Sequence, residues 1–247
     1  MQKLTTSLPR INSLAKVSGQ ISHYKKQRTL ANFFFTDNNQ KIMGLAAIAG
    51  GLTGAFGQAA GNVRDAANLH EEADYVEMKV DGQPVKGWVW FSPFSDGDIV
   101  EVIGTKKESY FEAIAICRPS DRVISLYPHC SRGKKAHVKS VLKWWVILTG
   151  IIIAFIAILD GLINFFSSTQ VEYVAQTASF FYAALSIYAI SGIFAYVNGR
   201  KFMIFVRAAT QVFKIIGLEN VDNVNLPKLT KRKPGDPGVF GVMYFNY

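Results

Sequence analysis

Two long runs of apolar residues dominate the second half of the chain, at residues 144–166 and 173–199. The first run contains one charged residue, Asp160, and the second contains none. A hydrocarbon core of about 30 Å is crossed by about 20 helical residues, and a helix satisfies its own backbone hydrogen bonds in lipid. Buried helices of a soluble protein are the alternative, but such helices seldom lack charge on every face. The pattern therefore predicts a two-helix transmembrane hairpin, joined by the polar residues 167–172.

Short strand-like runs separated by turn residues precede the hairpin. Five such runs between residues 74 and 128 have Gly, Asp or Pro between them. They predict a small antiparallel β barrel, SH3-like or OB-like, over residues 71–131. Two further runs within residues 15–36, separated by Lys-Lys-Gln-Arg, predict a β hairpin in the N-terminal segment 1–41. The expected fold class is an α+β membrane protein, and pairing of this hairpin with the five strands would make one β domain.

A segment rich in Gly and Ala, residues 42–70, separates those two β regions. Its glycines Gly50, Gly54, Gly57 and Gly61 have the spacing at which helix backbones touch closely in lipid. One interpretation is a self-associating glycine zipper that enters a membrane. The other is a peripheral helix, because Gly lowers helix stability and supplies little apolar area. A third full crossing is disfavoured, because it would separate two basic regions that both favour the cytoplasm.

The region after the second run, residues 201–247, predicts a cytoplasmic amphipathic helix and a basic tail. Apolar residues that share one helical face are Phe205, Ala209, Val212, Phe213 and Ile216. This helix is expected either on the inner leaflet or against the barrel. The apolar C-terminal end is expected to add an edge strand or to dock in a groove.

Charge sets the expected orientation. The net charge is +9, and basic residues flank the hairpin while residues 167–172 carry none. The topology-setting residues are Lys134, Lys135, Lys139, Lys143, Arg200 and Lys201. By the positive-inside rule, both flanks and both termini are expected in the cytoplasm of a multi-pass membrane protein. The lipid bilayer is the expected partner, and nucleic acid is not, because no nucleic-acid-binding motif accompanies the charge.

The sequence does not predict an enzyme. GxSxG, HExxH and phosphate-binding loop motifs are missing from the chain, and no cofactor is expected. Cys117, Cys130, His129 and His137 lack the usual zinc spacings, so no metal is expected and the two thiols are predicted to lie in the core.

Three residues of the predicted spans are candidates for a membrane role. A carboxylate such as Asp160 is costly inside a span, so it either faces a partner, water or an ion path, or lies near the outer headgroups. Ser179 and Ala183 follow small-xxx-small spacing on the second span. That spacing suits packing against the first span or against another copy in a homo-oligomer.

The run EEADYVEMKVDGQPVKGWVWFSPFSDGDIVEVIG, followed by AICRPSDRVISLYPHCSRGKKAH and KWW, resembles a family of small bacterial inner-membrane proteins labelled as candidate type VI secretion system effectors. The resemblance covers about residues 15–200, including NFFFT. It implies a role in contact-dependent bacterial competition. The primary hypothesis is a non-enzymatic effector that acts on a bacterial membrane. The alternative is a membrane-anchored immunity or scaffold protein whose cytoplasmic β domain binds a type VI spike or a cognate effector.

Overall fold

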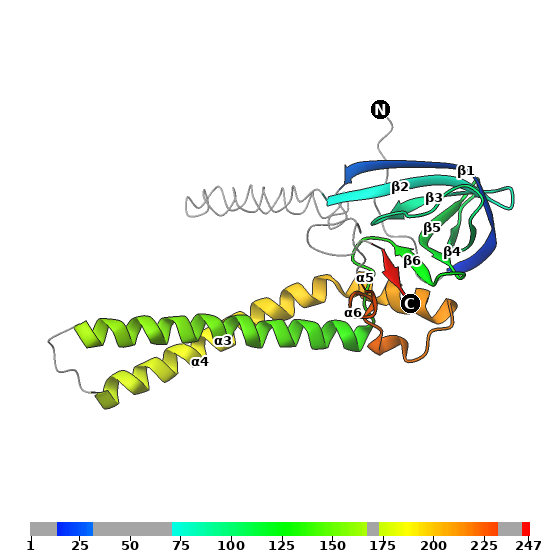
Figure 1. Cartoon of the computed structure of the whole chain (residues 1–247). Helices are drawn as coiled ribbons and strands as arrows, with labels where there is room; N and C mark the ends of the chain where they lie inside the picture. Colours follow the sequence, from blue (N-terminus) through cyan, green and yellow to red (C-terminus); the bar gives the residue numbers. More distant parts are fainter. Residues whose placement is uncertain (1–13, 32–70, 167–172, 232–243) are drawn as a thin grey trace, which may run out of the picture.

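The structure is a computed structural model that describes residues 14–31, 71–166, 173–231 and 244–247 (Figure 1). A β barrel lies at one end, and two long helices project away from it side by side. The elements in chain order are β1 (Ala15–Ala31), β2 (Glu71–Val80), β3 (Gln83–Val89), β4 (Ile99–Lys106), β5 (Phe111–Arg118), β6 (Val123–Leu126), α3 (Lys134–Phe166), α4 (Tyr173–Lys201), α5 (Met203–Ile215), the 3-10 turn η2 (Val221–Asn223), α6 (Leu226–Leu229) and β7 (Phe245–Asn246).

Five strands close the barrel in the order β1-β2-β3-β5-β4, and β4 pairs back to β1. The prediction of a small β barrel is confirmed. The prediction that its strands are all antiparallel is wrong for one pair, because β3 and β5 run parallel from Val85–Phe111 to Gly87–Ala113. The odd number of strands accounts for this pair, since five directions cannot alternate around a closed ring.

The predicted N-terminal hairpin is instead one continuous strand, β1. Its first part pairs with β4 and its second part with β2, and the register shifts between Ser22 and Lys25, where His23 has a φ of 54°. The polar run after that bulge is exposed strand and not a turn. The pairing of this segment with the later strands is confirmed, so the barrel begins before residue 71 and residues 32–70 are an insertion between β1 and β2.

The last predicted barrel strand, β6, lies outside the ring. It pairs with β5 on one side and with β7 on the other. The C-terminal end therefore adds an edge strand, which was one of the two placements predicted for it; the other was docking in a groove.

Two apolar cores flank the barrel wall. One fills the barrel interior and the other lies between β5, β6 and α5. Helix α5 buries Phe205, Ala209, Val212 and Phe213 there, because these residues share one helical face. The amphipathic helix thus packs against the barrel, which resolves the choice between barrel and leaflet.

Both long helices are long and apolar enough to span a membrane. They have 33 and 29 residues, and almost none of their most apolar stretches is buried by the rest of the protein. Helix α3 begins ten residues before Trp144, so it includes the basic cluster that was expected to precede the span.

Candidate functional site

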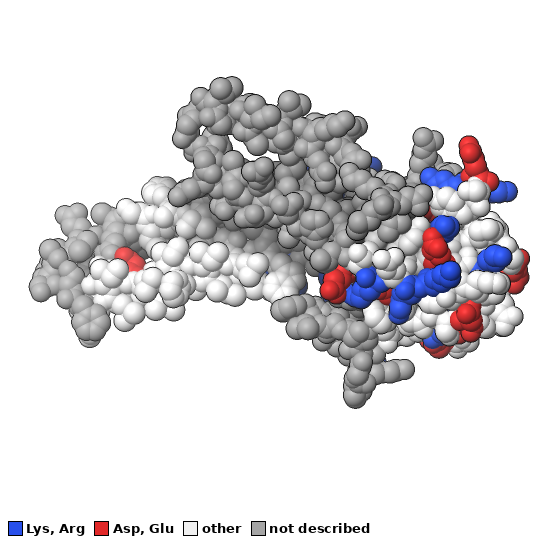
Figure 2. Space-filling model, turned by 90° about the horizontal axis from the view of Figure 1, so that it is seen from above, with Lys and Arg blue, Asp and Glu red and all other residues white. Residues whose placement is uncertain are grey.

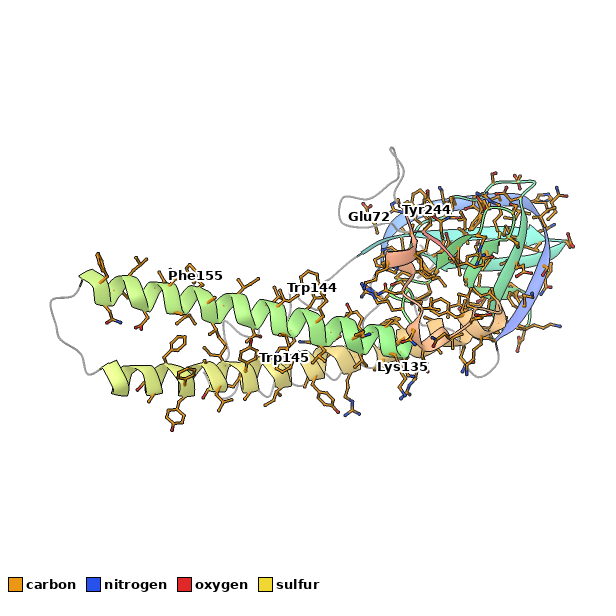
Figure 3. All side chains as sticks on the ribbon, turned by 60° about the horizontal axis from the view of Figure 1, so that its bottom comes forward. Glu72, Lys135, Trp144, Trp145, Phe155 and Tyr244 are labelled. Carbon is orange, nitrogen blue, oxygen red and sulfur yellow. The ribbon has the colours of Figure 1, made fainter. Side chains whose placement is uncertain are left out.

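A cavity of about 700 Å³ lies where the barrel meets the two long helices. We call it the junction cavity. Its polar wall contains His129, Ser131, Arg132, His137 and Asn198. Its apolar wall contains Trp90, Val141, Trp144, Trp145 and Leu148. The two tryptophans stand at the barrel-side half of α3 (Figure 3), so the cavity opens beside the hairpin.

Arg132 is the only Lys or Arg side chain among the described residues that line the junction cavity, and no Asp or Glu lines it there. Its backbone forms an isolated antiparallel bridge to Asn225, which holds it at the base of α3. The Arg132 Nε atom is buried and has no hydrogen-bond partner within the described part of the chain. Burial lowers the pKa of Arg132, because the charged guanidinium loses water without gaining a countercharge.

Backbone hydrogen bonds fix the base of α3 against the C-terminal segment. The Gly133 N–H donates to the Val224 carbonyl at 2.9 Å, and the Leu226 N–H donates to the Ser131 carbonyl at 3.2 Å. A Cβ atom at position 133 would lie 2.0 Å from the Val221 carbonyl oxygen, so only glycine fits there. These contacts hold one wall of the cavity in place.

An aromatic cluster forms the barrel side of the cavity. The His129 ring centroid lies 5.3 Å from that of Trp90, 5.3 Å from Phe205 and 5.5 Å from Phe202. Phe202 is the single residue between α4 and α5. The cluster therefore couples the end of the hairpin directly to the barrel core.

Polar side chains join α3 to α4 further along the hairpin. The Trp145 indole Nε1 donates to Ser191 Oγ at 3.0 Å, and Thr149 Oγ1 lies 3.1 Å from the same oxygen. Closer to the barrel, His137 Nε2 lies 3.2 Å from the Gly199 carbonyl oxygen. Glycines at this contact, such as Gly192 beside Trp145, let the helices approach closely.

The residues predicted from sequence occupy different parts of the molecule. Asp160 is half-buried toward the far end of α3 and accepts a hydrogen bond from Asn164 Nδ2 at 3.3 Å. Ser179 and Ala183 are exposed on α4. The glycines Gly50, Gly54, Gly57 and Gly61 lie outside the described residues. The topology-setting residues Lys134, Lys135, Lys139, Lys143, Arg200 and Lys201 are all exposed at the barrel end of the hairpin.

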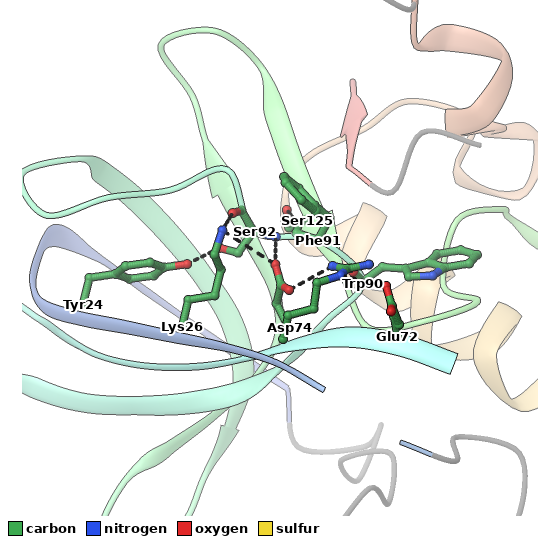
Figure 4. A network of polar contacts seen from close by, with 9 residues as sticks. Tyr24, Lys26, Glu72, Asp74, Trp90, Phe91, Ser92 and Ser125 are labelled. Carbon is green, nitrogen blue, oxygen red and sulfur yellow. Dashed lines mark hydrogen bonds and ion pairs between the residues drawn. The ribbon is translucent and has the colours of Figure 1, made fainter. Parts of the chain in front are cut away.

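A polar network joins β1 and β2 to the loop after β3 (Figure 4). The buried Asp74 carboxylate accepts hydrogen bonds from Arg28 Nη1 at 2.9 Å and from the Ser92 N–H at 2.8 Å. Lys26 Nζ lies 4.0 Å from the same carboxylate. Because both carboxylate oxygens have donors, this network fits a structural role better than a catalytic one.

The thiols of Cys117 and Cys130 are buried and free, which confirms the prediction that they lie in the core. Burial raises the pKa of both thiols, so neither is a ready nucleophile. Within residues 14–31, 71–166, 173–231 and 244–247, no cluster of three or more His, Cys, Asp and Glu side chains could hold a metal ion.

The sequence pattern does not predict the junction cavity. Its walls come together through contacts between residues far apart in the chain, such as Arg132 and Asn225, which no local pattern reports. Only the tryptophan pair and the adjacent basic residues gave a local signal.

Comparison of the chain with protein-family models, with curated proteins and with solved structures finds no match.

Proposed function

We propose that the chain is a non-enzymatic membrane anchor: α3 and α4 cross a bacterial inner membrane, and the barrel lies at its cytoplasmic surface to bind a partner. The observation that carries this proposal is the exposure of the hairpin. Phe155, Ile158 and Ile163 are 60%, 61% and 67% exposed on α3, and Phe194 is 65% exposed on α4. Soluble proteins rarely expose so continuous an apolar surface, whereas a bilayer would cover it.

The distribution of charge supports the same arrangement. On the face shown in Figure 2, charged side chains gather on the barrel, and the described part of the hairpin is almost free of them. Residues 144–166 would extend about 34 Å at helical rise, close to the thickness of a hydrocarbon core. Lys135, Lys139 and Lys143 would then lie between the core and the barrel, where anionic headgroups attract them.

The connections between hairpin and barrel favour an anchor that holds the barrel in a fixed orientation. Seven residues, 127–133, separate β6 from α3, and the backbone contacts of Ser131 and Gly133 hold this link against the C-terminal segment. On the other side, Phe202 leads directly from α4 into the buried face of α5. Two short attachments and a shared apolar core restrict rotation of the barrel relative to the membrane.

We also infer that the barrel is OB-like rather than SH3-like. The OB-fold is a five-stranded Greek-key barrel, and the β3–β5 pairing between strands that are not consecutive fits that description. OB barrels use one face and the loops beside it for binding. This supports a partner-binding role for the barrel.

Topology is the direct test of this proposal. A Ser168→Cys variant should react from outside the cell with a membrane-impermeant maleimide. The matched Lys231→Cys variant should react only after the inner membrane is permeabilised. The native thiols contribute little background, because both are buried. Extraction of the protein by alkaline carbonate without detergent, or the reverse labelling pattern, would contradict the proposal.

The second candidate function is an effector that damages a bacterial membrane by self-association. The observation that favours it is the exposed pair of small side chains on α4, Ser179 and Ala183, at a spacing that suits close packing of another helix. Expression in a susceptible cell should then collapse the membrane potential, and Ala183→Leu should abolish the collapse by filling the small face. If the protein is only an anchor, the membrane potential should stay unchanged with the wild-type protein and with the Ala183→Leu variant.

The link to type VI secretion rests on the sequence resemblance and has its own test. If the anchor serves as an immunity or scaffold protein, deletion of the gene should make cells sensitive to attack by siblings with an active type VI system. Equal survival of deletion and parent strains would remove that link and leave the anchor proposal standing.

A further inference from the structure

We propose that the junction cavity binds one acidic phospholipid, with Arg132 contacting the headgroup phosphate and the apolar wall contacting the upper part of an acyl chain. This inference rests on the proposed membrane insertion of the hairpin and adds a ligand to it.

The polar end of the cavity lacks a negative charge. Arg132 has no carboxylate partner within the described part of the chain, and its buried Nε has no hydrogen-bond acceptor there. Partial burial of a cation is costly unless it is paired. A phosphate group supplies the missing countercharge, because its oxygens match the planar fork of donors of a guanidinium.

The base of α3 adds to this electropositive environment. Helix α3 has 33 residues and no acidic side chain in its first turn, while Lys134 and Lys135 occupy that turn. The N-terminal end of a helix carries a partial positive charge. Ser131 and Arg132 lie within three residues of this end and line the cavity, so an anion bound there would also be stabilised by the helix.

The shape and composition of the cavity select an amphiphile over a small anion. Along α3 its wall runs from His137 to Leu148, which is about 17 Å at helical rise. The polar residues Ser131, Arg132 and His137 lie at the barrel end of α3, whereas the wall along α3 is apolar from Val141 to Leu148. Trp144 and Leu148 are also 55% and 54% exposed, so the apolar wall is continuous with the surface that the bilayer would cover.

The test uses the full chain purified in a neutral detergent. Thermal unfolding is followed while phosphatidylglycerol or phosphatidylcholine is added at matched mole fractions, since a ligand that binds the folded state raises its stability. The wild-type protein should bind phosphatidylglycerol about tenfold more tightly than phosphatidylcholine, because the choline cation of phosphatidylcholine already neutralises the phosphate that Arg132 would contact. Arg132→Gln should lose this preference. Arg207→Gln, at an exposed arginine on α5 that does not line the cavity, should keep it.

Two further arms make the result decisive. Inorganic phosphate and glycerol phosphate should raise the thermal stability of the protein only weakly. If they raise it as much as phosphatidylglycerol does, the ligand is a soluble anion and the lipid proposal is overturned. Equal binding of both lipids by the wild-type protein would also overturn it, and this comparison needs no variant to fold. Failure of the membrane proposal is recognised separately, because the protein would then leave the membrane fraction in carbonate.

Discussion

The Trp145 indole Nε1 donates a hydrogen bond to the Ser191 hydroxyl at 3.0 Å and joins the two long helices. The same hydroxyl lies 3.1 Å from the oxygen of Thr149, whose side chain is buried in the contact. We expect Ser191→Ala to lower the free energy of unfolding by about 1 kcal/mol, because the Trp145 indole and the Thr149 hydroxyl lose their shared partner and a hydrogen bond contributes about 0.5 to 1.5 kcal/mol. Unfolding in mixed micelles, followed by circular dichroism, measures the loss.

Ser186→Ala is the matched control on the same helix. The Ser186 hydroxyl donates to the Tyr182 carbonyl within α4 at 2.8 Å. It is exposed and forms no hydrogen bond to the described residues of α3. Its removal should change stability by less than about 0.5 kcal/mol. Equal losses in the two variants would show that the Trp145–Ser191 contact does not hold the hairpin together.

The Asp74 carboxylate is the centre of the barrel's polar network. Its side chain is 1% exposed, and it forms an ion pair with Arg28 at 2.9 Å. Asp74→Asn should destabilise the barrel by about 3 kcal/mol, because the buried side chain at position 74 would lose the charge that pairs with Arg28 and Lys26. The control is Glu72→Gln, which removes another carboxylate bound to Arg28 but one that is 62% exposed. That change should cost less than about 1 kcal/mol in urea unfolding. If Asp74→Asn and Glu72→Gln lower the free energy of unfolding by similar amounts, the buried network does not stabilise the barrel.

The fold illustrates which features a sequence pattern reports. Short runs separated by Gly, Asp and Pro predicted the strands from β2 to β6, because turn residues bound these strands and many of their residues are buried. The exposed Lys-Lys-Gln-Arg run in β1 was wrongly predicted to be a turn, because an outward-facing polar stretch of strand and a loop have similar compositions. The parallel β3–β5 pair follows from closure of an odd ring, and closure is a property of the whole barrel rather than of any one strand.

The hairpin boundaries show a related difference between composition and structure. The sequence predicts a membrane span that begins at residue 144, whereas the helix that contains it, α3, begins at Lys134. Lysine is a good helix former, so a basic cluster does not mark the end of a helix. The junction cavity could not be foreseen, because Trp90, Arg132 and Phe245 reach it from three separate parts of the chain.

Tyr24 predicts a specific loss of stability at alkaline pH. Burial, reinforced by the charges of Asp74 and Asp98, raises its pKa to about 12, although its hydrogen bond to Ser92 acts in the opposite direction. An unfolded tyrosine releases its proton near pH 10. Between these values the unfolded chain binds fewer protons than the folded protein, so stability falls as the pH rises.

The check is urea unfolding of the wild-type protein and of Tyr24→Phe at pH 8, 10, 11 and 12. The variant lacks the hydrogen bond to Ser92, so it should be less stable at pH 8. Its stability should then fall less steeply than that of the wild type above pH 10, and the difference between them should narrow. Parallel profiles would show that Tyr24 ionises alike in the folded and unfolded states.

Gly133 tests whether the base of α3 determines the orientation of the barrel. A Cβ atom at this position would meet the Val221 carbonyl oxygen at 2.0 Å and the Asp222 backbone at 2.8 Å, and backbone atoms cannot move aside as a flexible side chain can. Gly133→Ala should therefore displace the η2 turn and cost about 1 to 3 kcal/mol. Gly161→Ala, within α3, is the control, because a Cβ there meets nothing within 4 Å. It should be neutral or stabilise the helix by up to about 1 kcal/mol.

The two glycine variants also separate the junction cavity from general stability. Because Gly133 adjoins Arg132, its substitution should weaken the preference for phosphatidylglycerol along with stability, whereas Gly161→Ala should leave the preference unchanged. If Gly133→Ala unfolds more easily but retains the full lipid preference, the cavity does not depend on the contact between α3 and η2. The headgroup site would then have to be held by the barrel side alone, through His129 and its aromatic neighbours.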